Sequence, residues 1–455
     1  MFRIALSRRD FLKTTRILQA SAFFALLMPA LFGIPQRQTP ATSVVLYEGA
    51  RLIPGDGSPP VQNSAFLVEG DRFRLVDRRG GIRAPSGAAR VNLSGKTVIP
   101  AIVDLHTHLG YTVVRTNRTE KETYTRQNLE DHLQRLAFYG IGATLSMGVD
   151  RGDIPFQVRA NPLPGSALFY TAGPGIALPG MGPGADYRKD AALGVTTEAE
   201  VRKVVQELAA AKVDLVKFWV DDRNGTVQKL PPNLYRALID EAHKNNLRAV
   251  AHIYYLEDAK ELMRSGIDGF AHGIRDKDID DEFMTMLRQR RVFFTPNLPE
   301  RPLTLADLPL IAETLPPAQI QQLRAQITSG NVNANAELFN IQARNLKKIS
   351  DARVAQIGFG TDSGVSIGWT AHVEMADMVA AGMSPDQVIT AATRVSADIL
   401  KQSTLGMIAA GRSADFIVLD ANPIDNILNT LKISSVYIRG KEVDRRALKA
   451  EFTRH

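Results

Sequence analysis

Hydrophobic and polar positions follow two different patterns after residue 43. Short segments first alternate between apolar and polar positions, with Gly, Pro and Asp between them: SVVLYEGARLIPGDG, SAFLVEGDRFRLVD and ARVNLSGKTVIP. A period of two with turn residues between the segments is typical of β-strands. From about residue 99, continuous apolar runs alternate with segments of helical period. The pattern therefore predicts a small β domain followed by an α/β domain.

Eight apolar runs are the expected strands of the α/β region. They are AIVDLH, GATLSMG, ALFYTAG, DLVKFWV, RAVAHIY, GFAHG, VFFTPNL and QIGFGTD. Helical segments separate them, and two of these begin with a capping box, Thr197 with Glu200 and Ser384 with Gln387. Eight strands that alternate with helices predict an eight-fold βα barrel. Residues 300–350 break the helical pattern with TSGNVNANAE, which predicts a long insertion.

Short strands return near the C-terminus, in GMIAAGRSADFIVLDANP and ISSVYIRGKEVD. We expect them to complete the small β domain that begins before the barrel. The predicted fold is therefore α/β, a (β/α)8 TIM barrel inserted in a small β-sandwich domain built from both chain ends. The predicted boundaries are 44–98 and 406–448 for the small β domain and 99–405 for the barrel.

The N-terminal segment has the pattern of a targeting sequence. SRRDFLK places two consecutive arginines before Phe-Leu-Lys, and the apolar stretch ILQASAFFALLMPALFG follows. Residues 1–43 resemble a twin-arginine export signal, which implies a periplasmic or secreted protein. The alternative is a single helix that anchors the chain in a membrane. Gln19, Ser21 and Pro29 interrupt the apolar stretch and weigh against that alternative.

Charge and cysteine content exclude several classes of function. The formal net charge is +7, but residues 1–43 hold six basic and one acidic side chain, so the rest carries only +2. We therefore expect no nucleic-acid partner, and membrane contact only through the export signal. The sequence has no cysteine, which excludes disulfides, thiolate metal sites and a cysteine nucleophile. Any metal ion must be held by nitrogen and oxygen atoms.

Six polar residues stand at or near the ends of predicted barrel strands, where barrel enzymes place their chemistry. They are His106, His108, Lys217, His252, His272 and Asp362. A single histidine here can be a hydrogen-bonded core residue, and Asp362 alone can cap the next helix. Lys217 is less easily explained, because a charged lysine inside an apolar strand is costly and burial favours the neutral amine. A neutral lysine can react with carbon dioxide to form a carbamate that bridges two cations.

The other histidines give weaker signals. His132 and His243 lie in polar helical segments, which predicts that both are surface residues. His372 follows Asp362 by ten positions, and either a place near the pocket or the start of a helix fits it.

The motifs VDLHTH, VAHIY, FAHG and GTDSG, together with the lysine of the fourth strand, resemble the amidohydrolase superfamily. The resemblance is to its imidazolonepropionase-like and Xaa-Pro dipeptidase-like branch, and it covers nearly all of the chain after the signal. It implies a centre of two divalent metal ions, often zinc. His106, His108 and Asp362 would hold one ion, His252 and His272 the other, and carbamylated Lys217 would bridge them.

The resemblance also implies a reaction. Two cations that share a water lower its pKa, so that hydroxide forms near neutral pH, and Asp362 is the catalytic residue that carries the proton to the leaving nitrogen. The predicted enzyme is a hydrolase of a C–N bond in a cyclic amide, an N-acyl compound or a dipeptide-like molecule. An ester or lactone hydrolase is the alternative with the same centre. A non-catalytic periplasmic metal- or ligand-binding barrel is a further alternative, which would need neither Lys217 nor Asp362.

The expected partner is a small-molecule substrate, and association with further copies of the chain stays open. Four side chains in the segments that follow the predicted third, fourth and sixth strands are candidates to bind a carboxylate or a ring of that substrate. They are Tyr187, Arg188, Trp219 and Arg275.

Overall fold

The computed structural model of the protein describes residues 43–298, 303–330, 336–365 and 367–454. The predicted export signal, apart from residue 43, lies outside the described residues. No helix within the described ranges has the length and apolar character needed to cross a membrane.

Parallel strands form the centre of the α/β region. The strands β7 (Ile102–Thr107), β10 (Ile141–Ser146) and β11 (Leu168–Thr171) form one sheet in the order β11-β10-β7. A second sheet contains β13 (Leu193–Gly194), β12 (Ile176–Ala177), β14 (Val216–Val220), β15 (Ala249–Ile253), β16 (Gly269–Ala271), β17 (Phe293–Thr295) and β18 (Gln356–Ile357), in that order. Each of the eight predicted strand segments contains a strand, so the predicted α/β class with a parallel sheet is confirmed.

Backbone hydrogen bonds also connect the two parallel sheets. The Leu105 N–H donates to the Phe359 carbonyl at 2.8 Å, which joins β7 to the segment after β18. The Asp214 N–H donates to the Thr171 carbonyl at 2.9 Å, which joins β11 to the segment before β14. Because carboxyl ends of neighbouring parallel strands lie at the same edge, polar residues at those ends come together.

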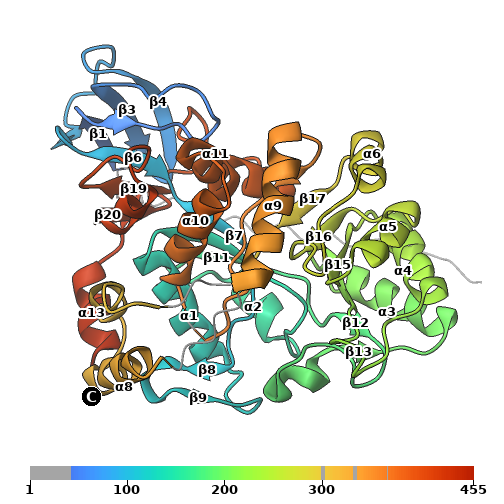
Figure 1. The fold of residues 1–455 in the computed structure, drawn as a ribbon. Coiled ribbons are helices and arrows are strands. Elements are labelled where there is room, and N and C mark those ends of the chain that lie inside the picture. Colours follow the sequence, from blue (N-terminus) through green and yellow to red (C-terminus); the bar gives the residue numbers. More distant parts are fainter. Residues whose placement is uncertain (1–42, 299–302, 331–335, 366, 455) are drawn as a thin grey trace, which may run out of the picture. The chain divides into compact units, whose positions relative to one another are not determined.

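Helices lie between the strands, as the sequence predicts (Figure 1). They are α1 (Arg126–Phe138), α2 (Ile154–Ala160), α3 (Glu198–Ala210), α4 (Pro232–Lys244), α5 (Leu256–Arg264), α6 (Asp281–Gln289), α9 (Ala336–Ala352), α10 (Thr370–Ala380), α11 (Pro385–Thr390) and α12 (Ser396–Ile399). Both predicted capping boxes are present, at the start of α3 and of α11. The predicted insertion contains α7 (Leu308–Ile311) and α8 (Pro317–Thr328) among its described residues.

Strands from both ends of the described chain form two smaller sheets. One has the order β4 (Arg72–Arg78), β3 (Ser64–Glu69), β1 (Val44–Glu48), β5 (Ala89–Asn92). The other has the order β2 (Arg51–Leu52), β6 (Thr97–Pro100), β19 (Phe416–Leu419), β20 (Ile433–Ile438), β21 (Lys441–Glu442), and the helix α13 (Arg445–Phe452) follows it. In the register of β6 and β19, Pro100 lies opposite Phe416.

Side chains of these two sheets share one apolar core. Tyr47 and Phe66 of the first sheet stack with ring centroids 4.9 Å apart, and Phe416 and Tyr437 of the second stack at 4.4 Å. The two pairs meet edge to face, with Phe66 5.2 Å from Phe416. Aromatic pairs in such geometries add to the free energy that burial alone provides.

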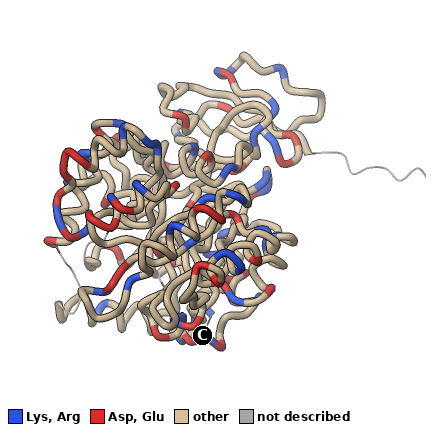
Figure 2. The backbone as a smooth tube through the Cα atoms, turned by 90° about the vertical axis from the view of Figure 1, so that its right-hand side faces the viewer, with Lys and Arg blue, Asp and Glu red and all other residues tan. Residues whose placement is uncertain are grey.

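Acidic and basic side chains are interspersed along the described chain (Figure 2). This mixture agrees with the small net charge that the sequence gives for the residues after position 43.

Candidate metal centre

The carboxyl ends of the parallel strands bring the six predicted residues into one region. His106 lies in β7, Lys217 in β14 and His252 in β15, whereas His108, His272 and Asp362 follow β7, β16 and β18. His272 and Asp362 both have positive φ angles, 76° and 56°, which residues with a Cβ seldom adopt. Backbone strain of this kind is often found at functional sites.

Asp362 is the common neighbour of three of the histidines. Ligand atoms of His106, His272 and Asp362 all lie within 4.8 Å of one another. The His108 Nε2 atom lies 2.9 Å from Asp362 Oδ1 and 3.2 Å from His106 Nε2. His272, which the resemblance assigns to the other ion, therefore lies beside His106 and Asp362 in this structure.

His252 has a carboxylate partner that the sequence analysis did not single out. Its Nε2 atom lies 3.2 Å from Asp221 Oδ2, and its ring centroid lies 4.4 Å from that of His272. Burial opposes ionisation of Asp221, but the bond with His252 more than compensates and lowers the pKa of Asp221 to about 2. A proton on Nε2 leaves the Nδ1 lone pair of His252 free for a metal ion. The available signal was the position of Asp221 directly after the lysine-bearing strand.

Asn297 is the hydrogen-bond partner of His106, as Asp221 is of His252, and the sequence did not predict it either. Its Oδ1 atom lies 2.9 Å from His106 Nδ1, so a proton on Nδ1 leaves the lone pair of Nε2, which lies 3.4 Å from Asp362 Oδ1, free for a metal ion. Asn297 follows β17 by two residues, the same kind of position as the predicted ligands.

Asp104 links two of the segments that carry ligands. Its Oδ1 atom accepts a hydrogen bond from the His106 backbone N–H at 3.0 Å, and its Oδ2 atom accepts one from the Thr361 hydroxyl at 2.7 Å. Burial raises the pKa of Asp104 to about 7, although both hydrogen bonds act to lower it. The side chain thus holds β7 and the residue before Asp362 together.

Lys217 is wholly buried, and its Nζ atom has no hydrogen-bond partner among the described residues. Burial lowers the pKa of Lys217 to about 7, Asp362 opposes this shift, and Arg188 and Arg275 add to it. The predicted neutral amine is therefore well populated near pH 7. This is the form that reacts with carbon dioxide.

The four site histidines are neutral at pH 7. Burial lowers the pKa of His108 to about 3 and that of His252 to about 4, and lowers those of His106 and His272 well below their usual value. Burial opposes ionisation of Asp362, but His106 and His108 more than compensate and hold the pKa of Asp362 well below its usual value. Neutral imidazoles, one carboxylate and an unpartnered amine are a donor set that fits divalent ions such as zinc.

The four candidate substrate residues lie in two kinds of surroundings. Trp219 is buried in an apolar cluster with Tyr111 and Tyr124, and its ring centroid lies 5.1 Å from Lys217 Nζ. Tyr187 packs on the same cluster, with its ring 5.5 Å from that of Tyr111. The side chains of Arg188 and Arg275 both have buried nitrogen atoms without a partner.

The structure corrects one of the predictions for the other histidines. His132 is fully buried, because α1 packs against the segment after β7, where Nδ1 of His132 accepts a bond from the Gly110 N–H. His243 is a surface residue, as predicted, with a side chain that is 40% exposed. His372 is buried and bonded to Thr430 and to the Tyr139 carbonyl, which gives it a structural role.

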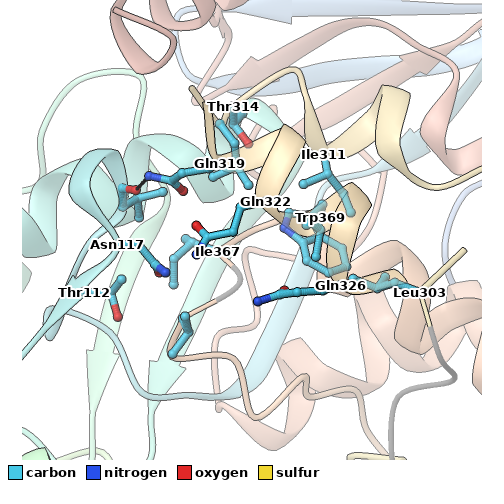
Figure 3. A pocket seen from close by; sticks show the side chains of 14 residues that line it. Thr112, Asn117, Leu303, Ile311, Thr314, Gln319, Gln322, Gln326, Ile367 and Trp369 are labelled. Carbon is cyan, nitrogen blue, oxygen red and sulfur yellow. Dashed lines mark hydrogen bonds between the residues drawn. The ribbon is translucent and has the colours of Figure 1, made fainter. Parts of the chain in front are cut away.

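A separate pocket lies beside the loops that follow β7 and β18 (Figure 3). Gln319, Gln322 and Gln326 of α8 line one side of it, and Ile367 and Trp369 contribute apolar surface. Among the described residues, its lining contains no charged side chain and none of the six candidate ligands.

Comparison with known proteins identifies a family whose model this chain matches. Residues 97–443 match the model described as the Amidohydrolase family. A Mycobacterium tuberculosis protein described as uncharacterized is 25% identical over 330 residues, 70% of this chain and 78% of its own. The imidazolonepropionase of Streptomyces avermitilis is 22% identical over 407 residues, 84% of this chain and 87% of its own.

Solved structures show the same fold. A putative prolidase from Bifidobacterium longum superimposes with a TM-score of 0.69 at 24% identity, covering 91% of this chain and all of its own. A Xaa-Pro dipeptidase with bound methionine gives a TM-score of 0.68 at 20% identity, covering 88% of this chain and 99% of its own.

Proposed function

Because the chain belongs to the amidohydrolase family, we propose that it is a metal-dependent hydrolase of a C–N bond. The bond belongs to a cyclic amide, an N-acyl compound or a dipeptide-like molecule. One observation carries this proposal: the clustered ligand atoms of His106, His272 and Asp362 lie at strand ends near a buried lysine without a partner. The prolidase and dipeptidase folds among the solved structures support the same class of reaction.

The donor set suits two divalent ions, with zinc favoured by the imidazole ligands. His106, His108 and Asp362 would hold one ion, His252 and His272 the other, and Lys217 would join them as a carbamate. Bound cations would supply a water of lowered pKa and would polarise the scissile carbonyl.

The chain's own residues supply the proton transfer and the substrate contacts. Asp362 is ionised and 40% exposed, so it can accept a proton from the attacking water and deliver it to the leaving nitrogen. An amide nitrogen leaves poorly without that proton. Asp221 and Asn297 keep His252 and His106 in the tautomers that present a lone pair to the centre. Tyr187, Arg188, Trp219 and Arg275 are the proposed substrate contacts.

The proposed architecture behind this site is a closed (β/α)8 barrel inserted in a β-sandwich. The backbone bonds from Leu105 to Phe359 and from Asp214 to Thr171 support closure. The shared aromatic core of the two smaller sheets supports a sandwich.

The proposed location is the periplasm or the exterior of the cell, because SRRDFLK has the pattern of a twin-arginine signal.

The metal content of the purified protein tests the centre. We expect about two divalent ions per chain in the wild type, the number that such a shared site holds. Lys217→Ala should lose at least one of them. The matched control Lys244→Ala, whose side chain is 60% exposed on α4, should keep the wild-type content. Wild-type protein without metal, or Lys217→Ala with unchanged content, would contradict the proposal.

A further inference from the structure

Two arginines at the candidate centre have buried guanidinium nitrogens without an acceptor among the described residues. Arg188 is in the short helical segment Asp186–Ala191, and Arg275 follows His272 by three residues. The Nε atoms of both, and Nη2 of Arg275, are buried and have no hydrogen-bond partner within the described ranges. The guanidinium carbons lie 5.6 Å from the Tyr187 ring and 5.8 Å from the Tyr254 ring, respectively.

Other buried or half-buried arginines have acceptors: some pair with carboxylates, whereas Arg248 and Arg439 donate to backbone carbonyls of Ile399 and of Leu163 and Ser166. Arg135 pairs with Asp131 at 2.7 Å, Arg159 with Asp214 at 3.0 Å, and Arg445 with Glu313 at 3.1 Å, measured between the closest nitrogen and oxygen atoms. Buried donors without partners are rare in native proteins because they lose their bonds to water. Arg188 and Arg275 therefore have donors to spare at the place where a substrate must bind.

The two guanidinium groups approach the centre from different sides. A Cβ atom on Gly364 would lie 3.3 Å from Arg188 Nη1 and 3.3 Å from His108 Cβ, so Arg188 lies beside the His108 and Asp362 segments. Arg275 lies on the side of His252 and His272: it follows His272 by three residues, and its backbone N–H donates at 2.9 Å to the carbonyl of Tyr254, two residues after His252.

Neither arginine forms an ion pair with the carboxylates of the centre. Asp221 lies beside His252 and Asp362 beside His108, and within the described ranges neither carboxylate is paired with Arg188 or Arg275. Bound cations would add positive charge beside the two arginines. The described lining of the pocket in Figure 3 holds no charged side chain, so the two arginines at the candidate centre are better placed to meet an anion.

We propose that Arg275, assisted by Arg188, binds a carboxylate of the substrate. The Nε and Nη2 atoms of Arg275 form one edge of its guanidinium, and such an edge matches both oxygens of a carboxylate. The substrate is then an N-acyl amino acid or a dipeptide-like amide with a free carboxylate, and not a neutral cyclic amide. This inference rests on the proposed C–N hydrolase function and selects among its substrate classes.

Matched substrate pairs test the inference. The full chain is assayed with N-acetyl amino acids and dipeptides, each paired with its C-terminal primary carboxamide, and cleavage of the common scissile bond is followed by product chromatography. We expect kcat/KM of the acids to exceed that of the carboxamides by about 100-fold, as for a buried charge pair. Arg275→Gln should remove this preference by lowering the acid rate about 100-fold, with the carboxamide rate within about threefold.

Two further variants separate charge from folding. Arg275→Lys should restore part of the preference, because an ammonium keeps the charge but lacks the fork. Arg344→Gln, on a side chain that is 57% exposed, should leave both rates unchanged. Calorimetric titration of metal-free protein provides a readout without turnover: the acids should bind more tightly than the carboxamides to the wild type, and equally to Arg275→Gln.

The outcomes distinguish the two proposals. Equal cleavage and equal binding of acids and carboxamides by the wild type would overturn the carboxylate inference and leave the hydrolase intact. Absence of C–N cleavage for every pair would overturn the proposed function, and the titration would still decide whether Arg275 recognises a carboxylate.

Discussion

The burial and protonation state of Lys217 were predictable from the sequence alone. Its place inside an apolar strand predicts burial and a neutral amine, and the structure shows both a buried side chain and a pKa of about 7. Asp221, Asn297 and the burial of His132 could not be predicted in the same way. Each depends on a hydrogen bond between segments 20 or more positions apart, and strand periodicity carries no information about such pairs.

The pKa of Lys217 predicts how stability depends on pH in metal-free protein kept in carbonate-free buffer. The folded-state pKa is about 7 and the ordinary value is 10.5, so between these pH values the unfolded chain binds a proton that the folded chain does not. The free energy of unfolding should therefore rise with pH in this window, by about 4 kcal/mol from pH 7 to pH 10. Below pH 7 both states are protonated and the cost of burying the charge is fully present.

Chemical unfolding of wild type and Lys217→Met at several pH values measures this contribution. Other groups titrate in both proteins, so the difference between the two curves isolates Lys217. Parallel curves from pH 7 to pH 10 would show that the amine is not buried as described.

Strands and helices were largely predictable because their patterns are local. Apolar runs mark eight of the parallel strands, and the capping boxes at Thr197 and Ser384 mark helix starts. The turns that direct the ligands were less predictable. His272 and Asp362 adopt positive φ without being glycine, which only the surrounding strands can impose.

The glycine after β10 gives a prediction for one such turn. Gly148 has a φ of 89°, and a Cβ atom there would lie 2.7 Å from Cγ of Lys217, whereas Gly152 has a φ of 56° and open space around it. Both alanine variants carry the strain of positive φ, but only Gly148→Ala also displaces Lys217. We expect Gly148→Ala to be less stable than Gly152→Ala by about 1–3 kcal/mol, the usual cost of overpacking a core. Equal midpoints of denaturant unfolding for the two variants would contradict this packing.

For the whole described chain, the sequence predicts that both ends contribute to one β domain, and the pairing of β6 with β19 brings these segments together. The order of the strands within the two smaller sheets was not predictable, since many registers satisfy the same alternation of apolar and polar positions. The choice of substrate class also needed the structure, because only the fold shows that Arg188 and Arg275 have buried nitrogens without partners among the described residues at the candidate centre.

Hydrolysis itself, followed before and after removal of metal, tests the central claim most directly. Cleavage of the C–N bond in a panel of N-acyl amino acids, dipeptides and cyclic ureides is followed by product chromatography for wild-type protein, for the chelated protein and after divalent metal is restored. Chelation should lower the rate at least about 100-fold and about two equivalents of metal should restore it, whereas Asp362→Asn should stay inactive throughout. C–N cleavage that survives complete removal of metal, or turnover confined to esters and lactones, would contradict a metal-dependent C–N hydrolase.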